Sequence, residues 1–399
     1  MSAAEARAAA ERAARASYGR LVALLAAPTG DLALAEDALS GAFEEALRRW
    51  PSGGVPENPE GWLLTVARNR QRDVWKSAAA RTTTVIEEGD VVVDPLAEHD
   101  PLAIGERRLE LLFVCAHPAI DQGVRTPLML QAALGFDAQQ IARAFAVPAP
   151  AMAQRLVRAK RRIKDARIPF AVPDRRAMAE RLPAVLEAVY GCAAIDWRGG
   201  PESLAGEAQY LAVTLAVLLG DEAEAWGLAA LTTLALARPP REVFVPLAEQ
   251  DPAEWDERLI AEGEAYLRRA QSRGPLGRFQ LEAAIQAVHV DRRRTGVTDW
   301  AALNTLYTAL LTVAPGLGAR VAAAVVIGQL HGPTAGLAAL PEAAESFQPY
   351  WAARADLLAR AGQDASGAYA KAVDLARQAG DEAVATFLRV RSNAAAERH

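Results

Sequence analysis

The chain has 399 residues, a formal net charge of −5, 51% hydrophobic residues and 23% charged residues. These values are ordinary for a globular protein with real cores, and the length predicts two or three domains. Two cysteines, Cys115 and Cys192, are too few for a disulfide framework and favour a reducing compartment. The most apolar stretches, 210–219 and 321–330, are shorter than the about 20 residues that span a bilayer, and the N-terminus lacks an apolar signal core. We therefore expect a cytoplasmic protein with no membrane partner.

The composition also predicts the fold class. Ala dominates the apolar residues, and Ala, Leu, Arg and Glu are strong helix formers, so we predict an all-α fold. Charge is unevenly spread, because residues 1–170 hold 22 Lys and Arg against 21 Asp and Glu, whereas residues 171–399 hold 22 against 28. This asymmetry indicates that one part of the chain meets a polyanion and another part does not.

The first predicted domain, residues 1–79, reads as three helices. Asp31 suits the N-cap of the second helix, and a loop is predicted at 51–59 from its Pro, Gly and Asn content. The third helix, 60–81, has its apolar side at Trp62, Leu63, Val66 and Val74. Its other side carries cationic and hydrogen-bonding groups beside an aromatic ring: Arg68, Asn69, Arg72, Asp73, Trp75 and Lys76. This mixture is typical of single-stranded DNA binding, although an ordinary protein surface explains it equally well.

A linker and a second helical domain follow. Residues 80–101 have no helical period and read as an acidic linker. The second domain, residues 102–170, is predicted to hold three or four short helices. Asp137 suits the N-cap of one of them, and Pro150 suits the first position of the last one.

The last helix of this domain is strongly basic. Met152, Leu156, Ala159 and Ile163 repeat at helical spacing and predict a buried seam. The remaining faces carry the candidates for DNA contact, which are Gln154, Arg155, Arg158, Lys160, Arg161 and Arg162. A short helix, a tight turn and a longer basic helix predict a helix-turn-helix, whose second helix enters the major groove. The alternative is a solvated charged face, which is the more common meaning of a charge run.

The third region, residues 171–399, repeats helical patterns broken by Gly, Pro and Asp. Successive helical hairpins that bury faces on one another predict a solenoid-like array. Ala365, Tyr369 and Ala372 keep the small–aromatic–small spacing of the second helix of a tetratricopeptide repeat, so we predict a repeat domain of that general type.

No pattern in the chain predicts catalysis. Cys115 and His117 lie close in sequence, but further metal ligands are not apparent, and a structural role at a helix end is the better interpretation. No nucleophile–base pattern or phosphate-binding Gly loop stands out. We therefore expect neither an enzyme nor a metal or other cofactor.

Several stretches together resemble a known family. They include "GDLALAEDALSGAFEEALRRWPSGGVPENPEGWLLTVARNRQRD", "LLFVCAHPAI", "QIARAFAVPAPAMAQRLVRAKRRIKDARIPF", "WDERLIAEGEAYLRRA" and "HGPTAGLAAL". In amino-acid sequence and in the order of its segments, the chain resembles the extracytoplasmic-function sigma factors of the sigma-70 family. It resembles in particular the subgroup with a tetratricopeptide-like helical extension. The resemblance covers nearly the whole chain, and the basic helix is its most specific part.

This resemblance implies partners and site residues. Residues 35–50 match the helix that grips the clamp of core RNA polymerase, with Asp37, Phe43, Glu44 and Arg48 as candidate contacts. Residues 62–76 match the segment that melts and reads the −10 element of promoter DNA, and residues 139–164 match the reader of the −35 element. The helical extension is implied to regulate or support the sigma domains, through a regulatory protein or an intramolecular contact.

One departure from the family keeps a second interpretation open. Where the family usually has a Gln–Glu pair in the clamp helix, this chain has Ser40 and Gly41. A Gly in mid-helix weakens the helix, and the missing Gln and carboxylate weaken the contact with polymerase. The alternative is a sigma-derived DNA-binding regulator or interaction scaffold with weakened polymerase binding.

Overall fold

The computed structural model describes residues 3–81, 101–145, 147–197, 203–271, 276–342 and 345–396. These residues form α-helices and two short 3-10 helices, with no strand among them, which confirms the predicted all-α fold. They fall into two compact units, the first made of 1–196 and 202–214, the second of 197–201 and 215–399. Within these described ranges, no helix is both long enough and apolar enough to cross a membrane.

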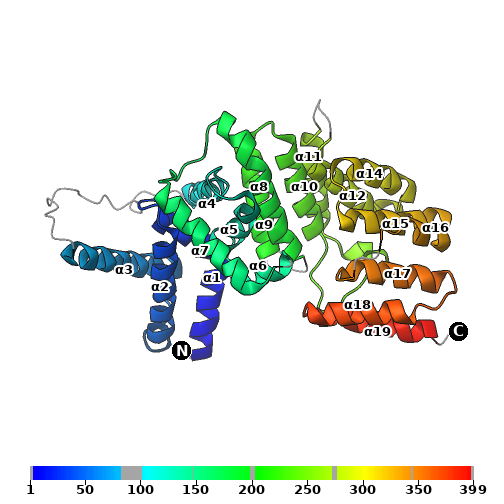
Figure 1. Ribbon diagram of the computed structural model, residues 1–399, viewed down its shortest axis with the longest axis horizontal. Coiled ribbons are helices and arrows are strands. Elements are labelled where there is room, and N and C mark those ends of the chain that lie inside the picture. Colours follow the sequence, from blue (N-terminus) through cyan, green and yellow to red (C-terminus); the bar gives the residue numbers. More distant parts are fainter. Residues whose placement is uncertain are drawn as a thin grey trace. The chain divides into compact units, whose positions relative to one another are not determined.

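The first unit begins with α1 (Ala3–Ala26), α2 (Leu32–Gly53) and α3 (Pro59–Arg81), which pack on one another (Figure 1). The predicted N-cap is confirmed, because the carboxylate of Asp31 accepts a hydrogen bond of 3.1 Å from the Leu34 amide. The loop predicted to start at Pro51 starts only at Gly54. Pro51 lies in the last turns of α2, and Gly54, with φ of 85°, ends the helix.

The buried side of α3 agrees with the predicted one at Leu63 but differs further along the helix. Leu64, Ala67 and Gln71 are buried, whereas Val74 is 51% exposed. The side-chain amide of Gln71 donates a hydrogen bond of 3.3 Å to the Leu25 carbonyl, which satisfies this polar group inside the core. Assigning the apolar side by hydrophobicity alone was therefore wrong for the last turns of this helix.

Four helices follow in the first unit. They are α4 (Pro101–Cys115), α5 (Gln122–Ala132), α6 (Ala138–Ala144) and α7 (Ala149–Asp165). The predicted cap of α6 is confirmed as a capping box, because the Asp137 side chain and the Gln140 side chain each accept the other's backbone N–H. Pro150 is the second residue of α7 and not the first, since the helix begins at Ala149. Most of the predicted linker, 82–100, lies outside the described residues.

Two further helices belong to the described part of the first unit. The helix α8 (Arg175–Ile195) packs against α4 and α5. The helix α9 (Leu204–Leu219) belongs to the first unit up to Thr214 and to the second unit beyond it. Arg108 of α4 pairs with Glu207 of α9 at 2.8 Å, and only 7% of the Arg108 side chain is exposed. The structure therefore groups residues 203–214 with the helices that precede them.

The second unit is a series of helices in which neighbours along the chain pack together, as Figure 1 shows for α14 to α19. Its elements are α10 (Ala223–Leu236), the 3-10 helices at Leu247–Glu249 and Pro252–Glu254, α11 (Glu257–Arg269), α12 (Arg278–Val290), α13 (Arg292–Thr295), α14 (Trp300–Val313), α15 (Leu317–His331), α16 (Pro333–Ala339), α17 (Gln348–Arg360), α18 (Ser366–Gln378) and α19 (Glu382–Ala396). Ala365, Tyr369 and Ala372 are all buried in one cluster that α17 to α19 form. Their assignment to a tetratricopeptide repeat stays a prediction.

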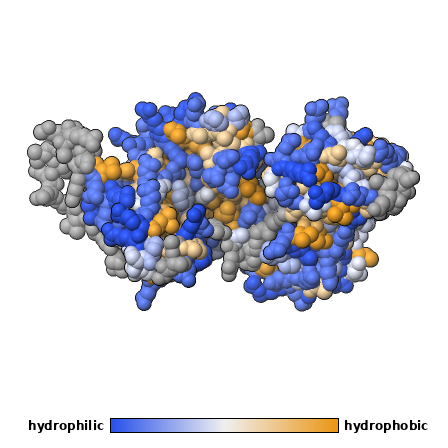
Figure 2. Space-filling view, turned by 90° about the horizontal axis from the view of Figure 1, so that it is seen from below, coloured by the Kyte–Doolittle hydropathy of each residue, from blue (hydrophilic) through white to orange (hydrophobic). Residues whose placement is uncertain are grey.

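The close contact between α10 and α12 in this unit depends on a glycine. Gly227 of α10 lies so near α12 that an added Cβ would be 2.6 Å from the Gln280 backbone nitrogen. A larger side chain would therefore push the two helices apart. On the outside, Figure 2 shows a mainly hydrophilic face with separate small hydrophobic areas.

Candidate nucleic-acid interface

The basic helix α7 has one buried side. Met152, Leu156, Ala159 and Ile163 are all buried, which confirms the predicted seam. The helix packs on α2, α5 and α6, and α6 is joined to it by the short segment 145–148. The seam thereby fixes which basic side chains of α7 face solvent.

Five of the six DNA-contact candidates on α7 are exposed: Gln154, Arg155, Arg158, Arg161 and Arg162. Arg161 pairs with Asp165 at 3.7 Å on the same helix, and both side chains are solvated. The guanidinium of Arg162 donates a weak hydrogen bond of 3.4 Å to the Ala119 carbonyl. Arg155, Arg158 and Arg162 also line one hollow beside the turn that precedes α5. Exposed guanidinium groups that converge in this way form a surface suited to phosphate oxygens.

The remaining candidate, Lys160, lies on the flank of α7 that faces α2. Its ammonium forms an ion pair with the carboxylate of Glu36, and only 10% of the lysine and 15% of the glutamate side chain is exposed. One turn further on, Lys164 pairs with Asp31 at 2.7 Å. Two lysines of the basic helix are thus engaged by acidic side chains of α2 or its cap.

The pKa values of the two acids in this contact, Glu36 and Asp31, are shifted in opposite directions. Burial raises the pKa of Glu36, and the charge and hydrogen bond of Lys160 offset this only in part. Burial also acts to raise the pKa of Asp31, but the hydrogen bonds from Lys164 and from the Leu34 amide lower it below its ordinary value. The Glu36 pair is therefore the more desolvated of the two.

The four polymerase-contact candidates lie on α2. Asp37, Glu44 and Arg48 are exposed, and Phe43 is half-buried. At this spacing Asp37, Glu44 and Arg48 lie on one face of the helix. Arg48 is engaged by an ion pair with Glu45, and its hydrogen bond lowers the pKa of that carboxylate. Asp37, Glu44 and Arg48 of α2 are therefore all accessible to solvent on one face of the helix.

Gly41 of α2 lies beneath Arg70 of α3. An added Cβ at Gly41 would be 2.4 Å from an Arg70 guanidinium nitrogen. The same guanidinium lies 3.8 Å from the Glu45 carboxylate. Gly41 is therefore covered by a flexible cationic side chain, and the adjacent Ser40 is exposed.

The candidates on α3 gather on one side of that helix. Asn69, Arg72, Asp73 and Trp75 are exposed, and 45% of the Trp75 surface is accessible. A guanidinium nitrogen of Arg72 lies 3.5 Å from the Asn69 side-chain oxygen, at the limit of hydrogen bonding. Arg68 is half-buried, and Lys76 lies in α3 but its side chain is outside the described part of the chain. An exposed aromatic ring beside cationic and amide groups can stack on an unpaired base.

The two helices that carry the candidate DNA surfaces, α3 and α7, both pack on α2. The sequence did not predict that Lys160 and Lys164 would turn toward α2. The available signal was charge complementarity, since Asp31 and Glu36 open α2 while α7 is cationic. Elsewhere in this unit, Cys115 is buried at the end of α4 and the His117 ring accepts a hydrogen bond from the Ala119 amide.

Comparisons with known proteins cover different parts of the chain. Residues 181–271 match a family of unknown function, DUF6596. The chain is 34% identical over 377 residues to the uncharacterized protein R00370 of Rhizobium meliloti, which spans 88% of each chain. It is 31% identical over 164 residues to the probable ECF RNA polymerase sigma factor SigI of Mycobacterium tuberculosis. This match covers 40% of this chain and 55% of that protein. No solved structure matches significantly.

Proposed function

Given that this chain belongs to the same protein family as R00370 of Rhizobium meliloti, we propose that it acts as an alternative sigma factor. It binds core RNA polymerase and directs transcription initiation at specific promoters. The similarity of part of the chain to a probable sigma factor supports a sigma-like role. In this proposal the protein works in the cytoplasm, makes or breaks no bond itself and needs no cofactor, because the polymerase performs the chemistry.

The observation that carries the proposal is the helix α7. Its buried seam holds it on the first unit, while Arg155, Arg158, Arg161 and Arg162 remain exposed. The short capped helix α6 precedes it, as in a helix-turn-helix. We assign Gln154, Arg155 and Arg158, near the N-terminal half of α7, to base edges, and the later arginines to phosphates.

The exposed side of α3 supports a second contact with promoter DNA. An unpaired base would stack on Trp75, while Arg72 and Asn69 bind the backbone and base edges. In the proposal, α3 contacts the −10 element of the promoter, and α7 contacts the −35 element. Both readers are attached to α2, on which the proposal places the polymerase contacts Asp37, Phe43, Glu44 and Arg48.

The second unit has a supporting or regulatory role in the proposal. Residues 220–399 hold 22 acidic against 18 basic residues, so this part repels nucleic acid at long range. It would therefore oppose non-specific binding through α7 and leave specific promoter binding to the complex with polymerase.

A second candidate function is a DNA-binding regulator or scaffold that has lost polymerase binding. The position of Gly41 favours it, because the site of the usual carboxylate is covered by Arg70. In that case α7 would still bind DNA, but α2 would not hold the polymerase clamp.

A binding and transcription assay separates the two functions. The purified chain is mixed with core RNA polymerase, and association is measured by size-exclusion chromatography, followed by run-off transcription from promoters selected from a genomic library. The sigma function predicts a complex and promoter-specific transcripts. Absence of any association with core polymerase would end the sigma proposal and leave the regulator.

A further inference from the structure

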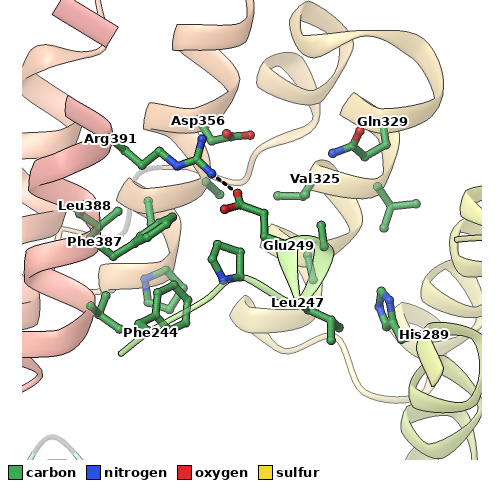
Figure 3. Close-up of a pocket in the computed structure, with 18 of the residues that line it drawn as sticks. Phe244, Leu247, Glu249, His289, Val325, Gln329, Asp356, Phe387, Leu388 and Arg391 are labelled. Carbon is green, nitrogen blue, oxygen red and sulfur yellow. Dashed lines mark hydrogen bonds and ion pairs between the residues drawn. The ribbon is translucent and has the colours of Figure 1, made fainter. Parts of the chain in front are cut away.

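The second unit contains a cavity of about 770 Å³ that opens to solvent and is lined by helices and by one connecting segment (Figure 3). Its walls come from α12, α14, α15, α17, α18 and α19, and from residues 243–250, here called the strap. Cavities of roughly 300–1,000 Å³ are the size at which proteins bury most of a small organic molecule. The cavity is therefore large enough for a ligand of that class.

Aromatic and aliphatic side chains from distant parts of the sequence make most of the wall. They include Phe244, Trp300, Tyr307, Val325, Tyr369 and Phe387. Phe244 of the strap meets Phe387 of α19 edge to face, with ring centroids 5.1 Å apart. Figure 3 shows this pair at one end of the cavity and Val325 of α15 on the opposite wall. A wall of this kind favours an apolar ligand.

Most of the charged groups that line the cavity already have partners within the chain. Arg391 of α19 forms an ion pair with Glu249 of the strap, which Figure 3 shows as a dashed line. Arg360 pairs with Asp356 at 3.6 Å. Arg292 donates hydrogen bonds of 2.8 Å and 2.7 Å to two strap carbonyls, those of Leu247 and Gln250. A charged ligand would compete with these existing contacts, whereas an uncharged molecule leaves them in place, so the cavity suits an uncharged molecule.

His289 of α12 adds a hydrogen-bonding group to this wall. Its burial, together with the nearby charges of Arg238 and Arg292, lowers its pKa to about 4. The ring is therefore neutral at physiological pH and offers one donor and one acceptor. It can orient a polar group of a ligand without adding charge.

The position of the strap favours a small molecule over a peptide as the ligand of this cavity. The strap is extended at Pro246, with φ −55° and ψ 145°, and then forms the 3-10 helix Leu247–Glu249. Arg292 donates hydrogen bonds to two of its carbonyls. Phe244 and Glu249 anchor it on α19. The chain itself therefore occupies Phe387 and Arg391 of α19, which an extended peptide could otherwise contact, and a compact space remains beside the strap.

We propose that this cavity binds one uncharged, mainly apolar organic molecule, held between the strap and α15. The site lies within the second unit and needs neither DNA nor polymerase. Its test is therefore independent of the proposed sigma function.

The test uses the full chain and Nile red, an uncharged dye whose fluorescence rises in an apolar site. We expect saturable binding of one dye per chain. Val325→Trp and Ala322→Phe place extra volume in the cavity, and we expect each to weaken binding at least tenfold. Val313→Trp is the matched control, because Val313 is 49% exposed and does not line the cavity. Circular dichroism and melting temperature establish that the variants are folded.

Three results would overturn the proposal. The first is equal dye binding by the control and both cavity-filling variants when all three are folded. The second is binding of an anionic naphthalene sulfonate dye at the same site as tightly as Nile red. The third is displacement of the dye from the wild-type chain by a synthetic peptide of residues 241–251, which would identify the cavity as part of a peptide groove.

Discussion

Lys160 of α7 and Glu36 of α2 form an ion pair that is almost entirely withdrawn from solvent. The two residues are 124 positions apart in sequence. Their pairing joins the helix that the proposal assigns to DNA with the helix that it assigns to polymerase. Because Lys160 was predicted to contact DNA, the pair gives direct tests of what this lysine does.

The first prediction concerns the stability of this contact. Lys160→Met leaves the Glu36 carboxylate buried without its counter-ion, and we expect α2 and α7 to lose about 3 kcal/mol of local stability. The double variant Lys160→Met/Glu36→Leu removes both charges and should recover most of that loss. Hydrogen exchange of the α2 and α7 amides measures both effects.

Lys164→Met is the matched control for this cycle. Lys164 is 59% exposed, and its partner Asp31 still accepts the Leu34 amide. We expect a loss below about 1 kcal/mol. Equal losses for the two lysine variants would contradict the assignment of Lys160–Glu36 as the buried pair.

The second prediction concerns DNA binding by the exposed arginines. Arg158→Ala should weaken binding to a random duplex and reduce the slope of log affinity against log salt concentration by about 1. Arg258→Ala is the control, since its side chain is also exposed but lies on α11 in the second unit. Fluorescence anisotropy across a salt series measures the slope.

The same assay tests Lys160. We expect Lys160→Met/Glu36→Leu to change the salt slope much less than Arg158→Ala does, because the ammonium is already paired with Glu36. A drop as large as that of Arg158→Ala would mean that the pair opens when DNA binds.

The third prediction concerns Gly41. The side chain that covers it is the far end of Arg70, which can swing away, so Gly41→Ala should fold and gain up to about 1 kcal/mol of helix stability. Ser40→Gln/Gly41→Glu should in addition tighten association with core polymerase about tenfold, which corresponds to ~1.4 kcal/mol. Ser40→Gln alone is the control, and affinity is measured by biolayer interferometry. An unchanged affinity of the double variant would show that these positions do not limit polymerase binding.

The fourth prediction concerns acid stability of the second unit. The pKa of His289 is lowered to about 4, so the folded chain binds fewer protons at this site than the unfolded chain does. This contribution to stability is complete above the ordinary histidine pKa and is lost as the pH falls toward 4. At pH 5 we expect a loss of about 2 kcal/mol relative to pH 8.

His289→Gln should remove this part of the pH dependence, which calorimetry at the two pH values would record. His331→Gln is the control, because His331 is exposed at the end of α15. The explanation fails if the wild type and His289→Gln lose the same stability between pH 8 and pH 5.

The fifth prediction concerns the acidic part of the chain. Removing residues 220–399 keeps α9 whole and removes more acidic than basic residues. The truncated chain should bind non-specific DNA more tightly, with a steeper salt dependence, since long-range repulsion is lost. Unchanged affinity in the anisotropy assay would refute an opposing role for the second unit.

Features set by neighbours along the chain could be predicted. The caps at Asp31 and Asp137 and the buried seam of α7 follow from residues within one or two turns, and the structure confirms them. The seam could be found because its apolar residues alternate with charged ones at helical spacing. In α3 the same reasoning failed, because Gln71 is buried through a hydrogen bond to Leu25, a partner that periodicity does not reveal.

The sequence by itself therefore determined the all-α class, the start of several helices and the concentration of positive charge on α7. Only the tertiary structure decided that Lys160 meets Glu36, that Arg70 covers Gly41, and that Phe244 and Phe387 pack together at one end of a cavity. The physical reason is distance along the chain. Helix formation and capping depend on local hydrogen bonds and on spacing, whereas the partner of a charged or aromatic side chain depends on which helices pack together.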